Sequence, residues 1–145
     1  TSVHANGLFD GFLDLTYAYR FGPPQHDVVA STIRDRSTGN LLAAEYYFPG
    51  AIASDSPVDI GLNARVERSV DGYALVLGTE RFALGVAIDI DGFCPDDNYF
   101  HLEPDETRRV GLRATAHGAI PRGHVTALNG RNPQPILIEE TVHAR

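Results

Sequence analysis

Short runs of alternating apolar and polar residues recur along the chain, and turn-forming residues separate them. Fourteen Gly and nine Pro are spread throughout, so no window long enough for a helix carries an uninterrupted apolar stripe at helical spacing. The runs are rich in β-branched and aromatic residues, which is typical of strands in an antiparallel sandwich or barrel. The pattern therefore predicts an all-β protein.

The first part of the chain, residues 8–48, contains three predicted strands, at 13–21, 28–34 and 41–48. The second and third are joined by a loop in which Gly39 can take a left-handed conformation, so we expect a hairpin with a bulged or longer loop. Three strands are too few to close a sandwich. We expect them to pack on the second domain, on a partner chain or on strands that this chain lacks.

Aromatic side chains are the candidate contact residues of this first part. Tyr17, Tyr19 and Phe21 share one face of the first predicted strand, and Tyr46 lies near the end of the third. Sugar rings stack on exposed aromatic faces, so these four residues are candidate contacts for a carbohydrate or for another domain. In a half-buried sheet such a row more often belongs to the core, and the chain has no Trp. The row alone therefore does not establish a binding platform.

The second part of the chain follows a segment without a strand pattern, residues 49–57, which is the candidate linker. Seven predicted strands come after it, at 62–70, 73–79, 82–90, 99–102, 107–115, 124–128 and 136–142. Asp71 and Gly72 predict a tight hairpin turn between the first two. Seven short strands separated by turns suit one sandwich. The predicted fold is thus an immunoglobulin-like antiparallel β-sandwich with additional strands on its N-terminal side.

The predicted turn at residues 91–98 is polar and acidic. The turn and its flank carry four carboxylates, on Asp89, Asp91, Asp96 and Asp97. A calcium loop beginning at Asp89 would need an acid or amide at position 93 and a Glu at position 100, where the chain has Phe93 and Phe100. We therefore expect a solvated turn whose Asp and Asn side chains bond nearby backbone amides, and no metal site.

Recognisable catalytic motifs are missing from the sequence. The six His residues, at positions 4, 26, 101, 117, 124 and 143, form no His-x-x-x-His pair, so surface or capping roles are expected. A retaining glycosidase needs two carboxylates facing one pocket, but the Glu residues lie mostly beside turns or at polar strand positions. There is also no nucleophile elbow and no phosphate loop. The sequence predicts no catalytic residue and no cofactor.

Composition and charge narrow the class of partner. The chain has 145 residues, 43% of them hydrophobic, and 12 Arg without Lys against 19 Asp plus Glu give a net charge of −7. Nucleic acid is not expected without a basic stripe, and no apolar run approaches the roughly 18 residues of a membrane helix. Cys94 is the only cysteine, which excludes an internal disulfide. Residues 1–15 lack the pattern of a secretion signal, so we expect a cytoplasmic location. Because the chain does not begin with Met, we expect it to be a processed chain or a part of a longer one.

Two sets of motifs resemble a known family. One is residues 14–24 (DLTYAYRFGPP) followed by HDVV, and the other is residues 81–83 (RFA), 86–89 (VAID) and 97–104 (DNYFHLEP). In this order they resemble the C-terminal immunoglobulin-like region of bacterial β-mannosidases of glycoside hydrolase family two. Asp105 stands where those enzymes commonly have Gly.

The resemblance implies an ancillary part rather than a catalytic one. In those enzymes a (β/α)₈ barrel of roughly 250 residues carries both catalytic Glu residues, one of them after an Asn, and no Asn here is followed by Glu. The resemblance assigns residues 1–48 to the closing strands of a preceding β-sandwich domain, 49–57 to a linker and 58–145 to the final immunoglobulin-like domain. The expected partner is the rest of the parent enzyme, including its barrel.

Three hypotheses follow for the function. The first is a non-catalytic C-terminal region of a β-mannosidase-like glycoside hydrolase that packs against the parent enzyme, which hydrolyses terminal β-mannosides. The second is an autonomous carbohydrate-binding sandwich whose ligand is a β-mannoside oligosaccharide. The third is a stand-alone adhesion or interaction sandwich, against which only the family motifs argue.

Overall fold

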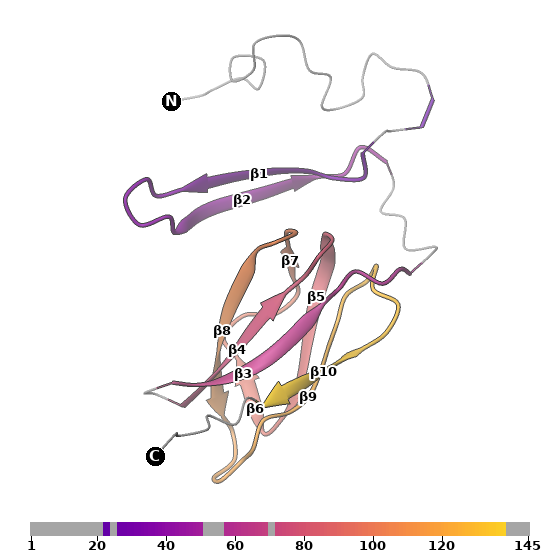
Figure 1. The fold of residues 1–145 in the computed structure, drawn as a ribbon. Helices are drawn as coiled ribbons and strands as arrows, with labels where there is room; N and C mark the ends of the chain where they lie inside the picture. The colour runs from indigo at the N-terminus through magenta and orange to yellow at the C-terminus, as the bar shows by residue number, and fades with distance from the viewer. Residues whose placement is uncertain (1–21, 24–25, 51–56, 70–71, 139–145) are drawn as a thin grey trace, which may run out of the picture. The chain divides into compact units, whose positions relative to one another are not determined.

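The computed structural model describes residues 22–23, 26–50, 57–69 and 72–138. The chain divides into two units, Thr1–Ala53 and Ser54–Arg145, which are described separately. Strands are the regular elements of the described residues, as the sequence pattern predicts (Figure 1). Tyr17, Tyr19 and Phe21, with the strand predicted at 13–21, lie outside these residues.

The described residues form no helix that is long and apolar enough to cross a membrane.

The first unit contains an antiparallel hairpin of β1 (Val29–Arg34) and β2 (Leu41–Tyr47). The register shifts between Ile33 and Arg34, and Gly39 in the connecting loop has φ +74°. Two backbone hydrogen bonds of 2.8 Å close the loop, from the Asp35 N–H to the Asn40 carbonyl and from the Gly39 N–H to the Asp35 carbonyl. The predicted hairpin with a bulged loop is confirmed.

The Asp35 side chain organises this loop. Its Oδ1 accepts hydrogen bonds from the hydroxyl groups of Ser37 at 2.5 Å and Thr38 at 3.0 Å, and from their backbone N–H groups at 2.9 and 2.8 Å. These bonds, the Ser37 hydroxyl first, favour the ionised carboxylate and lower the pKa of Asp35 to about 2. The loop therefore keeps this anchor at neutral and mildly acidic pH.

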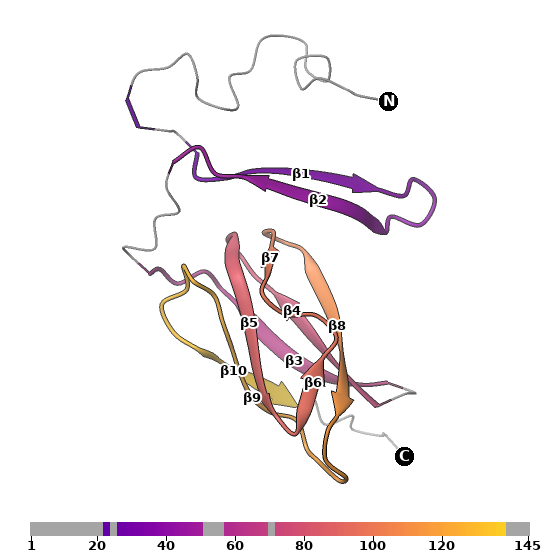
Figure 2. The ribbon, with the colours of Figure 1, turned by 180° about the vertical axis from the view of Figure 1, so that it is seen from behind.

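The second unit is a two-layer sandwich of eight strands. They are β3 (Asn63–Ser69), β4 (Gly72–Gly78), β5 (Ala83–Asp91), β6 (Phe93–Pro95), β7 (Phe100–Leu102), β8 (Thr107–Ala114), β9 (Arg122–Thr126) and β10 (Gln134–Ile138). One layer has the order β6-β8-β4-β3 and the other β10-β9-β5-β7. Figure 1 shows β3 and β4 in front of β5, and Figure 2, the view from behind, shows β5 in front of them.

Strand β10 connects the two layers. Its first residues, Gln134 and Pro135, pair antiparallel with β9. Its last residues, Ile136–Ile138, pair in parallel with β3. The β10–β3 pair is the parallel one among the described strand pairs, and the predicted immunoglobulin-like sandwich is otherwise antiparallel. Strands β3 and β4 pair from Asn63–Gly78 to Ser69–Gly72, and the loop between them, residues 70–71, lies outside the described residues.

The sequence predicted seven strands after the linker, and the described residues of the second unit form eight. The additional strand is β6, which lies inside the segment predicted to be one polar turn. Phe93 is buried at 8% exposure and pairs with Ala114 on β8, while Gly92, with φ +72°, makes the chain reversal. The burial of the Phe93 ring therefore favours a strand here, although the neighbouring residues are polar. In addition, β9 and β10 each begin two residues earlier than predicted.

The core lies between the layers. The inward positions of β4 and β5 alternate along each strand and include Leu75, Leu77 and Val86, which have no exposed surface. Val125 on β9 completes this centre. The core is formed by residues of both layers, so the strands are held by their packing as well as by the ladder.

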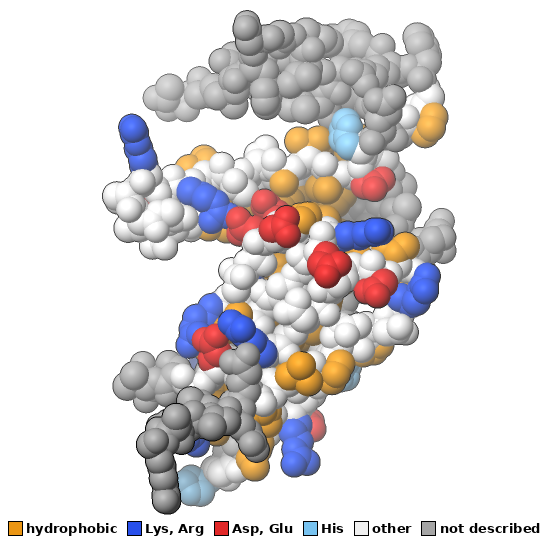
Figure 3. Space-filling view, in the orientation of Figure 1, with side chains coloured by type: hydrophobic (Ala, Val, Ile, Leu, Met, Phe, Trp, Pro, Cys, Tyr) orange, Lys and Arg blue, Asp and Glu red, His pale blue; other side chains and the backbone are white. Residues whose placement is uncertain are grey.

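The outer face of the first layer carries an ion network instead of a second core. Glu67 pairs with Arg65 at 3.0 Å on its own strand and with Arg109 on β8, and Figure 3 shows basic and acidic side chains side by side over β3, β4 and β8. Val76 on β4 lies between Arg65 and Arg109 in the register and is only 6% exposed. The aliphatic stems of the two arginines therefore cover the apolar side chain.

Candidate functional site

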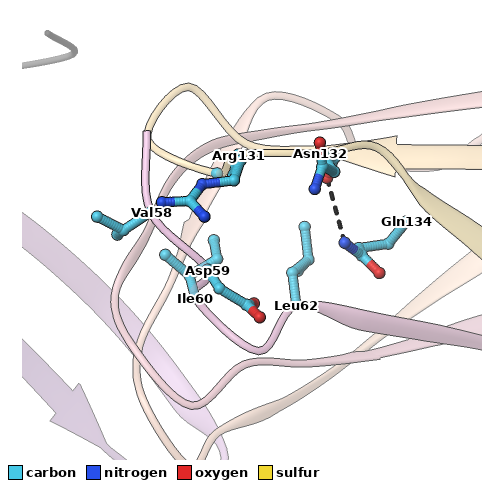
Figure 4. Close-up of a pocket in the computed structure, with 8 residues that line it drawn as sticks. Val58, Asp59, Ile60, Leu62, Arg131, Asn132 and Gln134 are labelled. Carbon is cyan, nitrogen blue, oxygen red and sulfur yellow. Dashed lines mark hydrogen bonds between the residues drawn. The ribbon is translucent and has the colours of Figure 1, made fainter. Parts of the chain in front are cut away.

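A small pocket lies where the chain enters the sandwich. Its cavity volume is about 50 Å³, which is room for about one water molecule or two. Pockets that bury a small-molecule ligand measure about 300–1,000 Å³, so this one is too small for a sugar. Figure 4 shows the lining residues, among them Val58, Asp59, Ile60, Leu62, Arg131, Asn132 and Gln134.

The walls of the pocket join the start of the domain to the loop between β9 and β10. The Val58 N–H donates to the Asn129 carbonyl at 3.1 Å, and the Arg131 N–H donates to the Val58 carbonyl at 3.0 Å. Val58 and Gly130 form a parallel β-bridge, and Arg131 Nε donates to the Pro57 carbonyl at 3.4 Å. We call these contacts the Val58 network. They fix the direction in which the chain enters the sandwich.

A second set of contacts holds the next residues. The Ile60 carbonyl accepts from the N–H groups of Glu80 and Arg81, both at 3.0 Å. The Thr79 hydroxyl, in a side chain that is 5% exposed, lies 2.9 Å from the same carbonyl and 2.6 Å from that of Arg81. Gly61 makes the turn into β3 with φ +66°. The start of the domain is thus bonded to two loops that are distant from it in sequence.

Asn129 extends the Val58 network to β5. Its Oδ1 accepts from the Leu84 N–H at 2.9 Å, and its Nδ2 donates to the Phe82 carbonyl at 2.8 Å. The Leu128 N–H donates to the Leu84 carbonyl at 2.8 Å. One amide side chain therefore connects the β9–β10 loop with the first residues of β5, and this connection carried no local signal in the sequence.

The Asp-Asn-Tyr-Phe motif at residues 97–100 has a structural role in three of its four positions. Asn98 Oδ1 accepts from the Ile88 N–H at 2.8 Å, and Asn98 Nδ2 donates to the Ile88 carbonyl at 3.0 Å. The side chain thereby makes the two hydrogen bonds that the backbone of a neighbouring strand would make with Ile88 on β5. Asp97 forms an ion pair with Arg108, whose guanidinium lies 4.0 Å from the centre of the Phe100 ring. Together these residues close the sandwich edge between β8 and β7.

Tyr99, the remaining residue of the motif, projects outward. It is 77% exposed and has φ +61°, a conformation that is costly for a bulky residue. Asn98 Oδ1 also accepts from the Tyr99 N–H at 3.0 Å, so the adjacent amide holds this backbone in place. Sequence reasoning missed Tyr99 as a candidate contact residue, because its exposure depends on the bonds that Asn98 makes with β5.

Of the four aromatic residues singled out by the sequence, Tyr46 lies in the described part of the chain. Tyr46 is half-buried on β2 and pairs with Ala30 across the hairpin. Tyr17, Tyr19 and Phe21 are outside the described residues, so their role as contacts stays a prediction. The small pocket described above belongs to the second unit.

The carboxylates also make structural contacts. Among the described residues, no group of three or more His, Cys, Asp or Glu side chains could hold a metal ion. The expectation that polar side chains in the acidic turn bond nearby backbone is confirmed for Asn98, and for Asp97, whose Oδ1 accepts from the Asn98 N–H at 2.8 Å. Glu67 lies in the ion network of the outer face.

His101 differs from the expected surface histidines, because it is half-buried. Its Nδ1 accepts from the Gly85 N–H at 3.0 Å, and its ring lies against Phe82 with 5.6 Å between ring centres. Gly85 has φ +57° and belongs to the irregular stretch of β5 where the register with β7 shifts. The accepting Nδ1 carries no proton, so the hydrogen bond requires the neutral ring.

We expect the stability of the domain to fall as the pH drops below about 6.5. Burial lowers the pKa of His101 below its usual 6.5, so the unfolded chain binds the proton first. The stabilisation that the neutral His101 ring gives the folded domain is complete above pH 6.5. It is lost as the pH falls toward the pKa of His101 in the folded domain. Urea unfolding at pH 7.5 and 5.5 measures this loss, which is expected to be smaller in His101→Gln. An equal loss in both proteins would contradict the assignment.

No curated protein matches the chain. Residues 57–129 match the family model Ig_mannosidase, described as an Ig-fold domain. The match begins at Pro57, the first residue of the Val58 network, and contains the Asp-Asn-Tyr-Phe motif that closes the sandwich edge. It covers half of the chain and contains β3–β9, whose two-layer arrangement agrees with an Ig fold. The chain therefore belongs to the Ig_mannosidase family of Ig-fold domains.

Proposed function

We propose that this chain is a non-catalytic C-terminal region of a β-mannosidase-like enzyme of glycoside hydrolase family two. In this proposal the parent enzyme hydrolyses terminal β-mannosides, and the Ig-like domain packs against its other domains. The observation that carries the proposal is the family match over residues 57–129. The proposal also includes residues 1–48 as part of a preceding sandwich domain, on the motif at residues 14–24.

The contacts of the second unit support a structural role. The pocket at Val58 is too small for a sugar ring, and Glu67 and Asp97 are paired with arginines. The Val58 network gives the chain a fixed direction at the start of the domain. A domain whose own start is bonded to two loops is suited to hold a neighbouring domain in a defined position.

The outer face of β5 is the described surface that best suits packing against another domain of the parent. Tyr99 directly precedes Phe100, which pairs with Val86 on β5, and the Leu128 side chain lies over Gly85. Tyr99 and Leu128 are 77% and 64% exposed, and Gly85 and Ala87 on the same strand have small side chains, while Asp89 and Asp91 lie farther along it. Asp97 and Asn98, the two polar residues before Tyr99, are bonded within the domain. A large aromatic beside small residues is typical of protein contacts.

The proposal is tested with the purified chain in two assays. We expect no turnover of p-nitrophenyl β-mannoside and no heat of binding with mannobiose or mannohexaose. Turnover would contradict the proposal, because it would require a catalytic carboxylate pair in this chain. Binding without turnover would support the alternative, an autonomous carbohydrate-binding module, and Tyr46→Ala and Tyr99→Ala would then locate the platform.

A further inference from the structure

Asn129 is followed directly by Gly130, and this pair has a chemistry of its own. In an Asn–Gly sequence the backbone nitrogen of Gly can attack the Asn side-chain carbonyl carbon, because Gly has no Cβ to obstruct the approach. The chain contains a second pair of this kind, Asn6–Gly7, outside the described residues. In an unfolded chain we expect the two pairs to react at similar rates, because both consist of Asn followed by Gly.

The fold engages every group that this reaction needs at Asn129. Asn129 Oδ1 accepts from Leu84 and Nδ2 donates to Phe82, at 2.9 and 2.8 Å. The attacking group, the Gly130 N–H, donates to the Ala127 carbonyl at 2.9 Å. Attack requires rotation of the side chain and release of the Gly130 N–H, so these three hydrogen bonds must break first.

We propose that Asn129–Gly130 is a deamidation site that is closed in the folded domain and reacts when the β9–β10 loop opens. Local opening of loops occurs in proteins well below the free energy of global unfolding. Each opening exposes the pair for a short time, and the product does not revert. The inference rests on the contacts of Asn129 and Gly130 and is independent of the proposed function.

The reaction balances with water as its only co-reactant. The Gly130 nitrogen forms a bond to Cγ of Asn129, the Cγ–Nδ2 bond breaks, and ammonia leaves with the proton from the Gly130 nitrogen. Water then opens the resulting five-membered imide at one of its two carbonyl carbons. Opening on one side gives aspartate, and opening on the other gives isoaspartate. No oxidant or reductant takes part.

Both products damage the Val58 network. An aspartate at position 129 has no N–H to donate to the Phe82 carbonyl, and it places a negative charge beside that oxygen. In isoaspartate the backbone runs through the former side chain, so the carbonyl that accepts from Val58 is replaced by a carboxylate in a different position. Each reaction that follows an opening of the loop therefore removes hydrogen bonds at the start of the domain irreversibly.

The test follows Asn129 and Asn6 by peptide mass mapping with isoaspartate detection, in mildly alkaline buffer. The full chain is incubated without urea, at urea concentrations below the unfolding transition, and fully unfolded. Three hydrogen bonds at Asn129 predict a rate at least about 100-fold lower in the folded than in the unfolded chain. The rate at Asn129 is expected to rise before the global transition begins.

Two variants complete the experiment. In Gly130→Ala the new Cβ would lie 3.3 Å from the Ala127 carbonyl oxygen, a tight contact, and the reaction is expected to slow in the unfolded chain. Asn129→Asp reproduces one product and removes the donor to the Phe82 carbonyl, so the free energy of unfolding of the domain is expected to fall. Equal rates at Asn129 in the folded and unfolded chain would overturn the proposal. So would an unreactive Asn129 in an unfolded chain whose Asn6 converts.

Discussion

Replacing Leu77 by alanine is expected to lower the free energy of unfolding by about 2–5 kcal/mol, the range for a leucine removed from a packed core. Leu77 has no exposed surface and lies on β4, which is bonded to β3 on one side and β8 on the other. Both neighbours restrict the movement that could fill the cavity, so the cost belongs in the upper part of the range. Urea unfolding monitored by tyrosine fluorescence measures the change.

Leu137→Ala is the matched control for this substitution. Leu137 is also in a strand of the second unit, but its side chain is 61% exposed. Its replacement is expected to change the free energy of unfolding by less than about 0.5 kcal/mol, as is usual for surface positions. Equal losses for Leu77→Ala and Leu137→Ala would mean that the core does not lie between the layers as described.

Asn98→Ala is expected to destabilise the domain by about 2–4 kcal/mol, because it leaves a buried backbone donor and acceptor without partners. The side chain bonds both the N–H and the carbonyl of Ile88, which is buried in the core. It also holds the Tyr99 backbone at its positive φ. Denaturant unfolding gives the loss, and hydrogen exchange at the Ile88 N–H is expected to rise with it.

Two further variants test whether stability depends on the hydrogen bonds of the Asn98 amide. Asn98→Asp keeps the Oδ1 acceptor but cannot donate to the Ile88 carbonyl, so it is expected to lose stability as well, with exchange at the Ile88 N–H less affected. Asn132→Ala removes an exposed Asn and is expected to stay within about 0.5 kcal/mol of the wild type. An Asn98→Ala domain as stable as this control would show that the ladder beside β5 does not depend on the amide.

The fold followed from local patterns where a strand has one buried face. Strand β5 shows this, because its inward residues are apolar and its outward residues Asp89 and Asp91 are polar, and the sequence placed it within one residue. Strand β6 failed the same test, because three residues are too few to show alternation and its neighbours are acidic. Its position depends on the burial of Phe93 against the core, which a local pattern does not reveal.

The contacts around the pocket were not predictable from the sequence, because they join distant residues. Asn129 and Leu84 are 45 positions apart. Neither residue lies in a catalytic or ligand-binding motif that the sequence would reveal. The Asp-Asn-Tyr-Phe motif was found through its resemblance, but the roles of Asn98 and Tyr99 became clear only with their partners. Asp105 shows the opposite case: its φ of +59° is the conformation that glycine favours, which fits the Gly that the resemblance leads one to expect there.

The parallel pair of β3 and β10 affects how the domain is made. These are the first and last strands of the sandwich, so the second partner of β3 is synthesised only after all of the other strands. While the ribosome still holds the end of β10, the growing chain can form the β3–β4 hairpin and the β4–β8 pair, but one edge of β3 stays without its partner. Pairing over so long a separation is slow. We expect this edge to be the part of the domain that a chaperone meets during translation.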